Sequence, residues 1–192
     1  MRLAIVLLLT LLAALPARAA EEEAALATTQ TLVGEAHAAL SETARPENER
    51  LAALRGAIDE AFAFDIWRRF LLEPLEASMT PEQMAEAETL LPGFLANLYR
   101  TNFEKGLSEA PAIGDVSPAR RDLLVRVRFP RPNGDTLPTD WRIRDFGDRG
   151  HLVIDVMVGG ASFLQLKRDE FSAIAAQGGG DALLAHLREN AV

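Results

Sequence analysis

The spacing of apolar residues changes along the chain from a helical period to an alternating one. In the first half apolar residues recur every three or four positions, which is typical of amphipathic helices. Beyond Pro111 they alternate with polar residues, as they do in half-buried strands, and a helical period returns near Asp169. This order of helices, a small antiparallel sheet and further helices predicts an α+β fold.

Two helices are predicted in the first third of the chain. The Ala-rich residues 21–44 predict an amphipathic first helix. A second helix is predicted between Pro46, which begins it, and Pro74, which ends it. Its apolar stripe consists of Leu51, Leu54, Ile58, Phe62, Ile66 and Phe70.

The third helix has a clear start signal. Thr80 stands at the N-cap, Pro81 in the first turn, and Gln83 where a capping box requires Glu or Gln. We expect this helix to end at Gly106 and to be kinked or broken at Pro92. After the proline its apolar face consists of Phe94, Leu95, Leu98, Tyr99 and Phe103.

Three strands are predicted from strict alternation. The inward positions are Leu123, Val125, Val127 and Phe129, then Trp141 and Ile143, then Leu152, Ile154, Val156 and Val158. The outward positions are Arg126, Arg128, Asp140, Arg142, Arg144 and Asp155. We therefore expect four arginines on one solvent-facing side of the sheet, either paired with its aspartates or docking an acidic partner.

The two faces also constrain the turns, because a register slip of one residue sends apolar side chains to solvent. An odd first loop, such as Asn133 to Asp135, keeps both faces intact and pairs Val127 with Trp141. By the same reasoning the second loop is predicted to be even, for example Phe146 to Arg149.

A bend and two helices are predicted after the third strand. Gly159 and Gly160 permit a sharp turn or bulge that directs the following apolar residues inward. A helix starting near Asp169 is expected to end at the glycines 178–180, and Asp181 to cap a last helix.

The N-terminus carries the pattern of an export signal. Arg2 precedes an apolar run from Leu3 to Leu15, and Ala17 and Ala19 form a small-x-small cleavage site. We interpret residues 1–19 as a signal peptide and residues 20–192 as a single domain. The alternative is an uncleaved anchor helix, although the apolar run is shorter than the ~20 residues that span a bilayer.

Charge and cysteine content exclude several classes of function. Without residues 1–19 the chain has 18 basic and 28 acidic residues, a net charge of −10, which disfavours nucleic-acid binding. The absence of cysteine excludes disulfides, thiolate metal sites and cysteine nucleophiles. We expect no cofactor.

The segment Gly159-Gly160-Ala161-Ser162 invites three chemical interpretations. A nucleophile elbow centred on Ser162 lacks its second glycine, and no phosphate-binding glycine pattern is present. A metal site of Asp145, His151 and Asp155 is possible, but alternation places His151 and Asp155 on the arginine-rich face. A structural bend, with Asp155 paired to arginine, is the favoured interpretation.

These patterns predict a fold but no function, and a resemblance to a known family indicates one. Asp155-Val156, Gly160, Ser162, Arg168 and Phe171 resemble the C-terminal pattern of the MlaC or toluene-tolerance family, periplasmic lipid-binding proteins of the Mla phospholipid-transport pathway. A second similarity is DWRIR with the strand after it, ahead of the closing LLAHLR. Weaker similarities at FDIWRRFL, TPEQ and LLPGFLANLY extend the resemblance over residues 62–188.

The resemblance implies a periplasmic lipid carrier. It implies a curved sheet and helices around an apolar pocket for a diacyl phospholipid, which is carried between the inner and outer membranes. The implied partners are an inner-membrane ABC transporter complex of the Mla type and an outer-membrane lipoprotein complex. A related branch is associated with hopanoid lipids, which leaves the lipid open. The candidate pocket residues are Phe94, Leu98, Val125, Val127, Trp141, Ile143, Ile154, Val156 and Phe163.

Two other classes of function stay open from the sequence. Small cone-shaped α+β proteins also serve as isomerases that use an Asp base and a Tyr donor, for which Tyr99 with Asp65 or Asp145 are the candidates. An interaction module with a close-packed interior and no cavity is the second.

Overall fold

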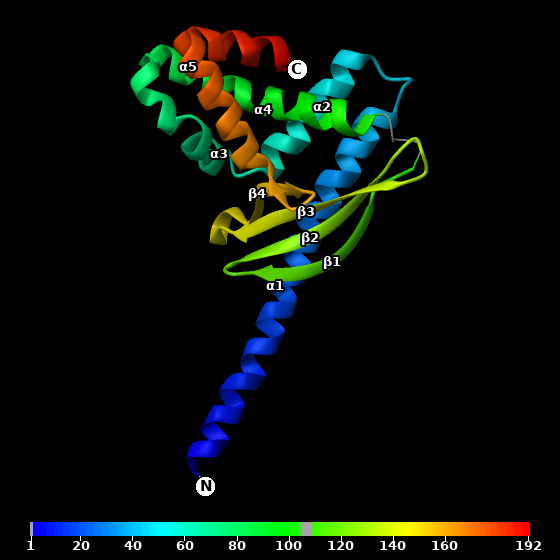
Figure 1. Cartoon of the computed structure of the whole chain (residues 1–192). Coiled ribbons are helices and arrows are strands. Elements are labelled where there is room, and N and C mark those ends of the chain that lie inside the picture. The colour runs from blue at the N-terminus through cyan, green and yellow to red at the C-terminus, as the bar shows by residue number, and fades with distance from the viewer. Residues whose placement is uncertain (1, 105–108) are drawn as a thin grey trace.

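The fold is α+β, as predicted (Figure 1). The computed structural model describes residues 2–104 and 109–192. The helices are α1 (Arg2–Ser41), α2 (Glu47–Ala61), α3 (Phe64–Leu71), α4 (Pro81–Phe103) and α5 (Phe163–Asn190), with 3-10 helices η1 (Glu73–Ser78) and η3 (Gly147–Arg149). The strands are β1 (Ala112–Ala119), β2 (Asp122–Pro130), β3 (Thr136–Asp145), β4 (His151–Val158) and β5 (Ala161–Ser162).

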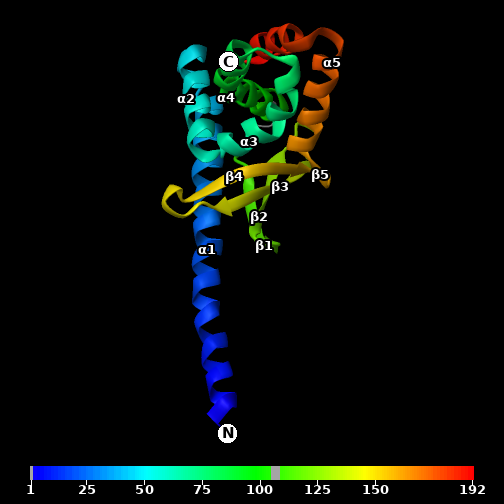
Figure 2. The ribbon, with the colours of Figure 1, turned by 90° about the vertical axis from the view of Figure 1, so that its left-hand side faces the viewer.

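The five strands form one antiparallel sheet in chain order, β1-β2-β3-β4-β5. Alternation predicted three of these strands, β2, β3 and β4, and did not predict the edge strands β1 and β5. Helices α2 to α5 gather on one side of the sheet, while α1 runs past the strands and extends beyond them at its N-terminal end (Figures 1 and 2). Among the residues that the structure describes, no helix is both long enough and apolar enough to span a membrane.

The predicted second helix is wrong in one respect, because it is divided at Phe62. Phe62 forms a parallel bridge with Val153, and the Ala63 N–H donates to the Val153 carbonyl oxygen (3.0 Å). The chain restarts as α3 with a new buried face, Trp67 and Leu71. The break brings the Phe62 ring to the inner surface of the sheet.

Helix α4 begins as predicted. The Thr80 hydroxyl accepts from the Gln83 N–H, and the Gln83 side chain accepts from the Thr80 N–H (2.9 Å), which completes the capping box. We expected either a kink or a break at Pro92. The helix is not broken there, because α4 continues through Pro92 to Phe103. Gly106, the expected end, lies outside the described residues.

The first hairpin confirms the odd parity but not the length of the loop. Residues 131–135 connect β2 to β3, so Val127 lies opposite Thr139, and Trp141 lies opposite Val125. The predicted pairing of Val127 with Trp141 is therefore wrong by two residues. A shift of two preserves both faces, which is why the alternation alone does not distinguish the two registers.

The second loop was predicted to be even and is odd. Asp145 pairs with His151 across a loop of residues 146–150. The reason is a bulge in β4: Arg142 lies opposite Asp155 while Ile143 lies opposite Val153, which leaves Ile154 unpaired.

At the bulge the alternation of inward and outward residues in β4 changes phase, so the residues before and after it do not follow one pattern. Beyond it, Val156 and Val158 keep the inward positions that alternation predicted. Before it, Val153 is fully buried, whereas Leu152, expected to face inward, is half-buried opposite Arg144.

The four arginines lie on one face of the sheet, as predicted, and are partly or fully exposed. Arg126 pairs with Asp140. Arg142 and Arg144 share the buried carboxylate of Asp122, both at 2.6 Å. Burial acts to raise the pKa of Asp122, but the hydrogen bonds and charges of the two arginines outweigh it and hold that pKa below its ordinary value.

Asp155 is buried rather than paired with the arginines, which corrects our expectation for it. Its carboxylate accepts from the Ser162 hydroxyl (2.6 Å) and from the N–H groups of Val156 (2.8 Å) and Leu164 (3.0 Å). The metal site considered above is also not formed, since the described residues contain no cluster of Asp, Glu and His able to hold a metal ion.

Helix α5 begins six residues earlier than predicted, directly after the glycine bend. Ser162 is its N-cap and accepts from the Gln165 N–H (3.0 Å). The predicted stop at the glycines is a kink, where Gly179 adopts φ 65° and ψ −158°, a conformation essentially restricted to glycine. Asp181, the expected cap, accepts instead from the Gln83 side chain (2.7 Å).

Candidate functional site

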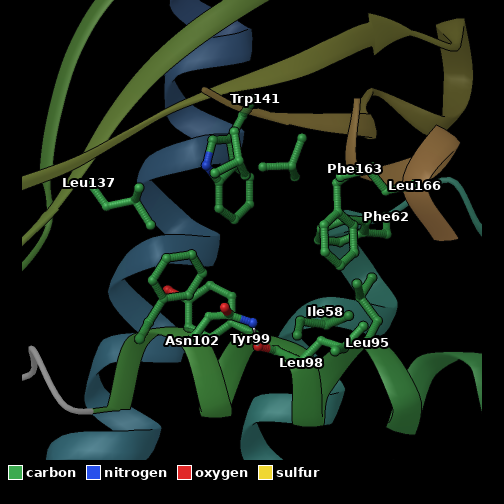
Figure 3. Close-up of a pocket in the computed structure, with 13 residues that line it drawn as sticks. Ile58, Phe62, Leu95, Leu98, Tyr99, Asn102, Leu137, Trp141, Phe163 and Leu166 are labelled. Carbon is green, nitrogen blue, oxygen red and sulfur yellow. Dashed lines mark hydrogen bonds between the residues drawn. The ribbon is translucent and has the colours of Figure 1, made fainter. Parts of the chain in front are cut away.

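An apolar cavity of about 250 Å³ lies between α4 and the inner face of the sheet (Figure 3). Helices α2 and α5 contribute to its walls. The lining residues are Ile58, Phe62, Leu95, Leu98, Tyr99, Asn102, Phe103, Leu137, Trp141, Val156, Val158, Phe163 and Leu166.

Helix α4 supplies one wall because its lining residues recur at helical spacing. Leu95, Leu98 and Asn102 lie three or four positions apart, so their side chains share one face. The opposite wall comes from the sheet, where Trp141 and Val156 are cross-strand neighbours.

The largest side chain in this wall, Trp141, has its one polar group paired within the protein. Its indole N–H donates to the Thr139 hydroxyl (2.8 Å), and that hydroxyl donates to the Val127 carbonyl oxygen (3.1 Å). All three groups are buried and satisfied. The indole therefore has no free donor for a ligand.

The cavity carries no charge. Its lining, which consists of described residues, contains no Asp, Glu, His, Lys or Arg. Tyr99 is the one titratable residue in it, and burial raises the pKa of its hydroxyl, so the group stays neutral. Such a site suits an uncharged, apolar ligand.

The arrangement required for an isomerase is not present. Tyr99 lies in the cavity, but Asp65 is exposed and pairs with Arg149 (3.3 Å), and Asp145 is exposed and accepts from the Gly147 N–H. Neither carboxylate lines the cavity. The presence of the cavity likewise argues against an interaction module with a close-packed interior.

Four of the nine residues predicted for the pocket line this cavity: Leu98, Trp141, Val156 and Phe163. The other five are buried elsewhere. Phe94 packs against Phe171 (5.4 Å between ring centroids) between α4 and α5. Ile154 is the bulge residue, and the remaining three, Val125, Val127 and Ile143, are at most 1% exposed in the packed core.

The other nine lining residues were not predicted from the sequence to line a pocket. They are Ile58, Phe62, Leu95, Tyr99, Asn102, Phe103, Leu137, Val158 and Leu166. A signal existed for several of them, since Leu95, Tyr99 and Phe103 belong to the apolar face predicted for α4. Leu166 is 53% exposed, and an exposed leucine beside an apolar cavity marks one of its margins.

This fold and cavity define a class of small α+β proteins with an apolar cavity between an antiparallel sheet and its helices. The chain belongs to the MlaC family, whose model, described as MlaC protein, matches residues 27–189. The resemblance inferred from the sequence is thereby confirmed.

A solved structure shares the fold. It is a phospholipid-binding protein from Ralstonia solanacearum in complex with a phospholipid, with a TM-score of 0.65 and 20% sequence identity. The match covers 86% of this chain and 96% of the other. No curated protein sequence matches this chain.

Proposed function

We propose that this protein is a periplasmic carrier that binds the acyl chains of a phospholipid in the cavity and moves the lipid between the inner and outer membranes. The observation that carries the proposal is the uncharged apolar cavity between α4 and the sheet in a chain of the MlaC family. The phospholipid complex of the Ralstonia solanacearum protein, which has the same fold, supports it.

A carrier is needed because acyl chains do not cross water unaided. Two chains with about thirty methylenes cost over ~20 kcal/mol in water, at ~0.8 kcal/mol for each methylene. A cavity of about 250 Å³ is slightly below the ~300–1,000 Å³ typical of ligand pockets. A diacyl lipid therefore requires that side chains of the lining move, or that part of the lipid stays outside.

The test is mass spectrometry of the protein purified from the periplasm of a Gram-negative host. Denaturing extraction is expected to release diacyl phospholipid in amounts close to equimolar, because no lining group repels an acyl chain. The intact mass is expected to correspond to residues 20–192, as a signal peptide cleaved after Ala19 predicts.

Each result can contradict one part of the proposal. A protein that carries no lipid contradicts the carrier function, and one that carries hopanoid contradicts the phospholipid assignment. Recovery of the intact Met1 terminus from the membrane fraction contradicts export with cleavage.

We infer that the arginine face of the sheet, Arg126, Arg128, Arg142 and Arg144, docks the carrier on acidic surfaces of its membrane complexes. The partners proposed are an inner-membrane ABC transporter complex of the Mla type and an outer-membrane lipoprotein complex. Residues 112–145 hold seven arginines and five aspartates, a net charge of +2, in a chain whose net charge is −8. Such asymmetry steers association with an acidic surface.

Arg128 is the sharpest probe of this face. It is exposed, and the described residues form no ion pair with it, whereas Arg142 and Arg144 hold the buried Asp122 in place. Arg128→Glu is expected to weaken binding to the inner-membrane complex several-fold at low salt, with a smaller effect at high salt. Surface plasmon resonance at two salt concentrations measures this.

The matched control is Arg55→Glu, which changes net charge equally at an exposed position on α2. Equal effects of the two variants would assign the loss to net charge rather than to the arginine face.

A further inference from the structure

Tyr99 places a hydroxyl group in an otherwise apolar interior. The residue is 6% exposed and lines the cavity. Its ring packs edge-on against Phe103, Phe129 and Trp141, with centroid distances of 4.9, 5.9 and 6.4 Å. Three aromatic contacts from α4, β2 and β3 fix the ring in place.

The hydroxyl of Tyr99 makes no hydrogen bond with any of the residues that the structure describes. Tyrosine hydroxyls in apolar surroundings usually have a partner. The Tyr99 oxygen is not one of the fully buried side-chain atoms of the described residues that lack a partner, so it is not sealed inside the core. Trp141, the other aromatic donor in the lining, has its partner in Thr139. Tyr99 thus differs from its neighbour in having a donor that remains available.

A second polar group lies one helical turn further along α4. Asn102 is exposed, and its side-chain amide donates to the Leu98 carbonyl oxygen (2.7 Å) of its own helix. Asn102 and Leu137 lie on one side of the cavity in Figure 3, and Phe62 and Leu166 lie on the other. The cavity therefore has a polar end, defined by Tyr99 and Asn102, and an apolar end.

We propose that Tyr99 determines ligand specificity by donating a hydrogen bond to an ester carbonyl oxygen of the bound lipid. This inference rests on the proposed function and adds an orientation to it. The ester end of the lipid lies at the polar end, near Asn102, and the acyl chains extend towards Leu95, Ile58 and Phe62.

The chemistry of the lining selects an ester over other oxygen groups. An ester carbonyl accepts without carrying charge, and it is the first polar group beyond the methylenes of an acyl chain. A phosphate or a free carboxylate would bring a negative charge into a cavity whose lining contains no cation. Those groups belong outside, in water.

The experiment compares two phospholipids with the same chains and headgroup, one ester-linked and one ether-linked. The ether lipid lacks the carbonyl oxygens. Delipidated wild-type protein is expected to prefer the ester lipid by about 2- to 10-fold in a competition assay, the range that one net hydrogen bond supplies. Tyr99→Phe is expected to lose the added affinity for the ester lipid and so to bind both lipids equally.

Phe163→Leu is the matched control, because it changes the cavity wall without removing a polar atom. It is expected to shift the affinity for both lipids together and to keep the preference. A Tyr99→Phe protein that keeps the full preference, or a wild-type protein without one, overturns the inference but leaves the carrier function standing. A wild-type protein that binds neither lipid overturns both.

A measurement on the wild-type protein makes the test independent of whether the variant folds. With lipid labelled at the ester carbonyl carbons, the infrared carbonyl stretch of bound lipid is expected to move to lower frequency than in an apolar solvent. Both ester bands at the apolar-solvent frequency would contradict a hydrogen bond from Tyr99.

Discussion

Val156→Trp is expected to remove lipid from the purified protein while leaving it folded. Val156 lines the cavity from β4, beside Trp141 and opposite α4, so the added indole occupies space proposed for acyl chains. Excluding even two methylenes lowers affinity by more than about tenfold, at ~0.8 kcal/mol each. Lipid per protein, measured by extraction and mass spectrometry, reports the loss.

Met157→Trp is the control, since Met157 lies opposite Asp140 in the register of the arginine face. It is expected to keep its lipid. Overpacking costs Val156→Trp about 1–3 kcal/mol of stability, so circular dichroism must show both variants folded. A folded Val156→Trp protein with a full lipid complement would mean that the lipid binds elsewhere.

Val127 shows why the position of such a probe requires the structure. From the alternation of β2, Val127 is as good a pocket candidate as Val156. It is fully buried and outside the cavity lining, so tryptophan there strains the core and reports nothing about the ligand. Periodicity identifies an inner face, but the position of the covering helix determines which part of that face meets a cavity.

The features that the sequence predicted correctly are those governed by local chemistry. The capping box of Thr80 and Gln83 involves atoms three residues apart. The odd parity of the first loop follows from the alternation of the two strands that it joins, Asp122–Pro130 and Thr136–Asp145. Each of these depends on a few neighbouring residues.

The errors arise where distant segments meet. The helix break at Phe62 is stabilised by its bridge to Val153, about ninety positions away along the chain. The β4 bulge at Ile154 changed the loop parity, because it adds a residue that no turn signal announces. The resemblance to the MlaC family, in contrast, was carried by Asp155, Gly160 and Ser162, although alternation assigned Asp155 the wrong role.

The role of Asp155 gives the second large prediction. Asp155→Ala is expected to lower the free energy of unfolding by about 2–4 kcal/mol, because it leaves buried donors without an acceptor. Asp155 is 7% exposed and binds the N–H groups of Val156 and Leu164 and the Ser162 hydroxyl. Urea denaturation measures the change.

Two variants separate this role from a general effect of losing an aspartate. Asp155→Asn retains one acceptor oxygen and is expected to cost less than Asp155→Ala. Asp140→Ala removes the partner of Arg126 on the outer face and is expected to cost under about 1 kcal/mol, as exposed ion pairs do. Equal losses at Asp140 and Asp155 would contradict the role assigned to the buried carboxylate.

The Asp155 contacts also connect the glycine bend to the cavity. Ser162, held by Asp155, caps α5, and the first turn of that helix carries Phe163 and Leu166 to the cavity wall. Asp155→Ala is therefore expected to reduce lipid per protein even under conditions where the variant stays folded. If the folded variant kept its full lipid complement, the bend would be needed for stability alone, and the wall formed by α5 would not contribute to retention of the lipid.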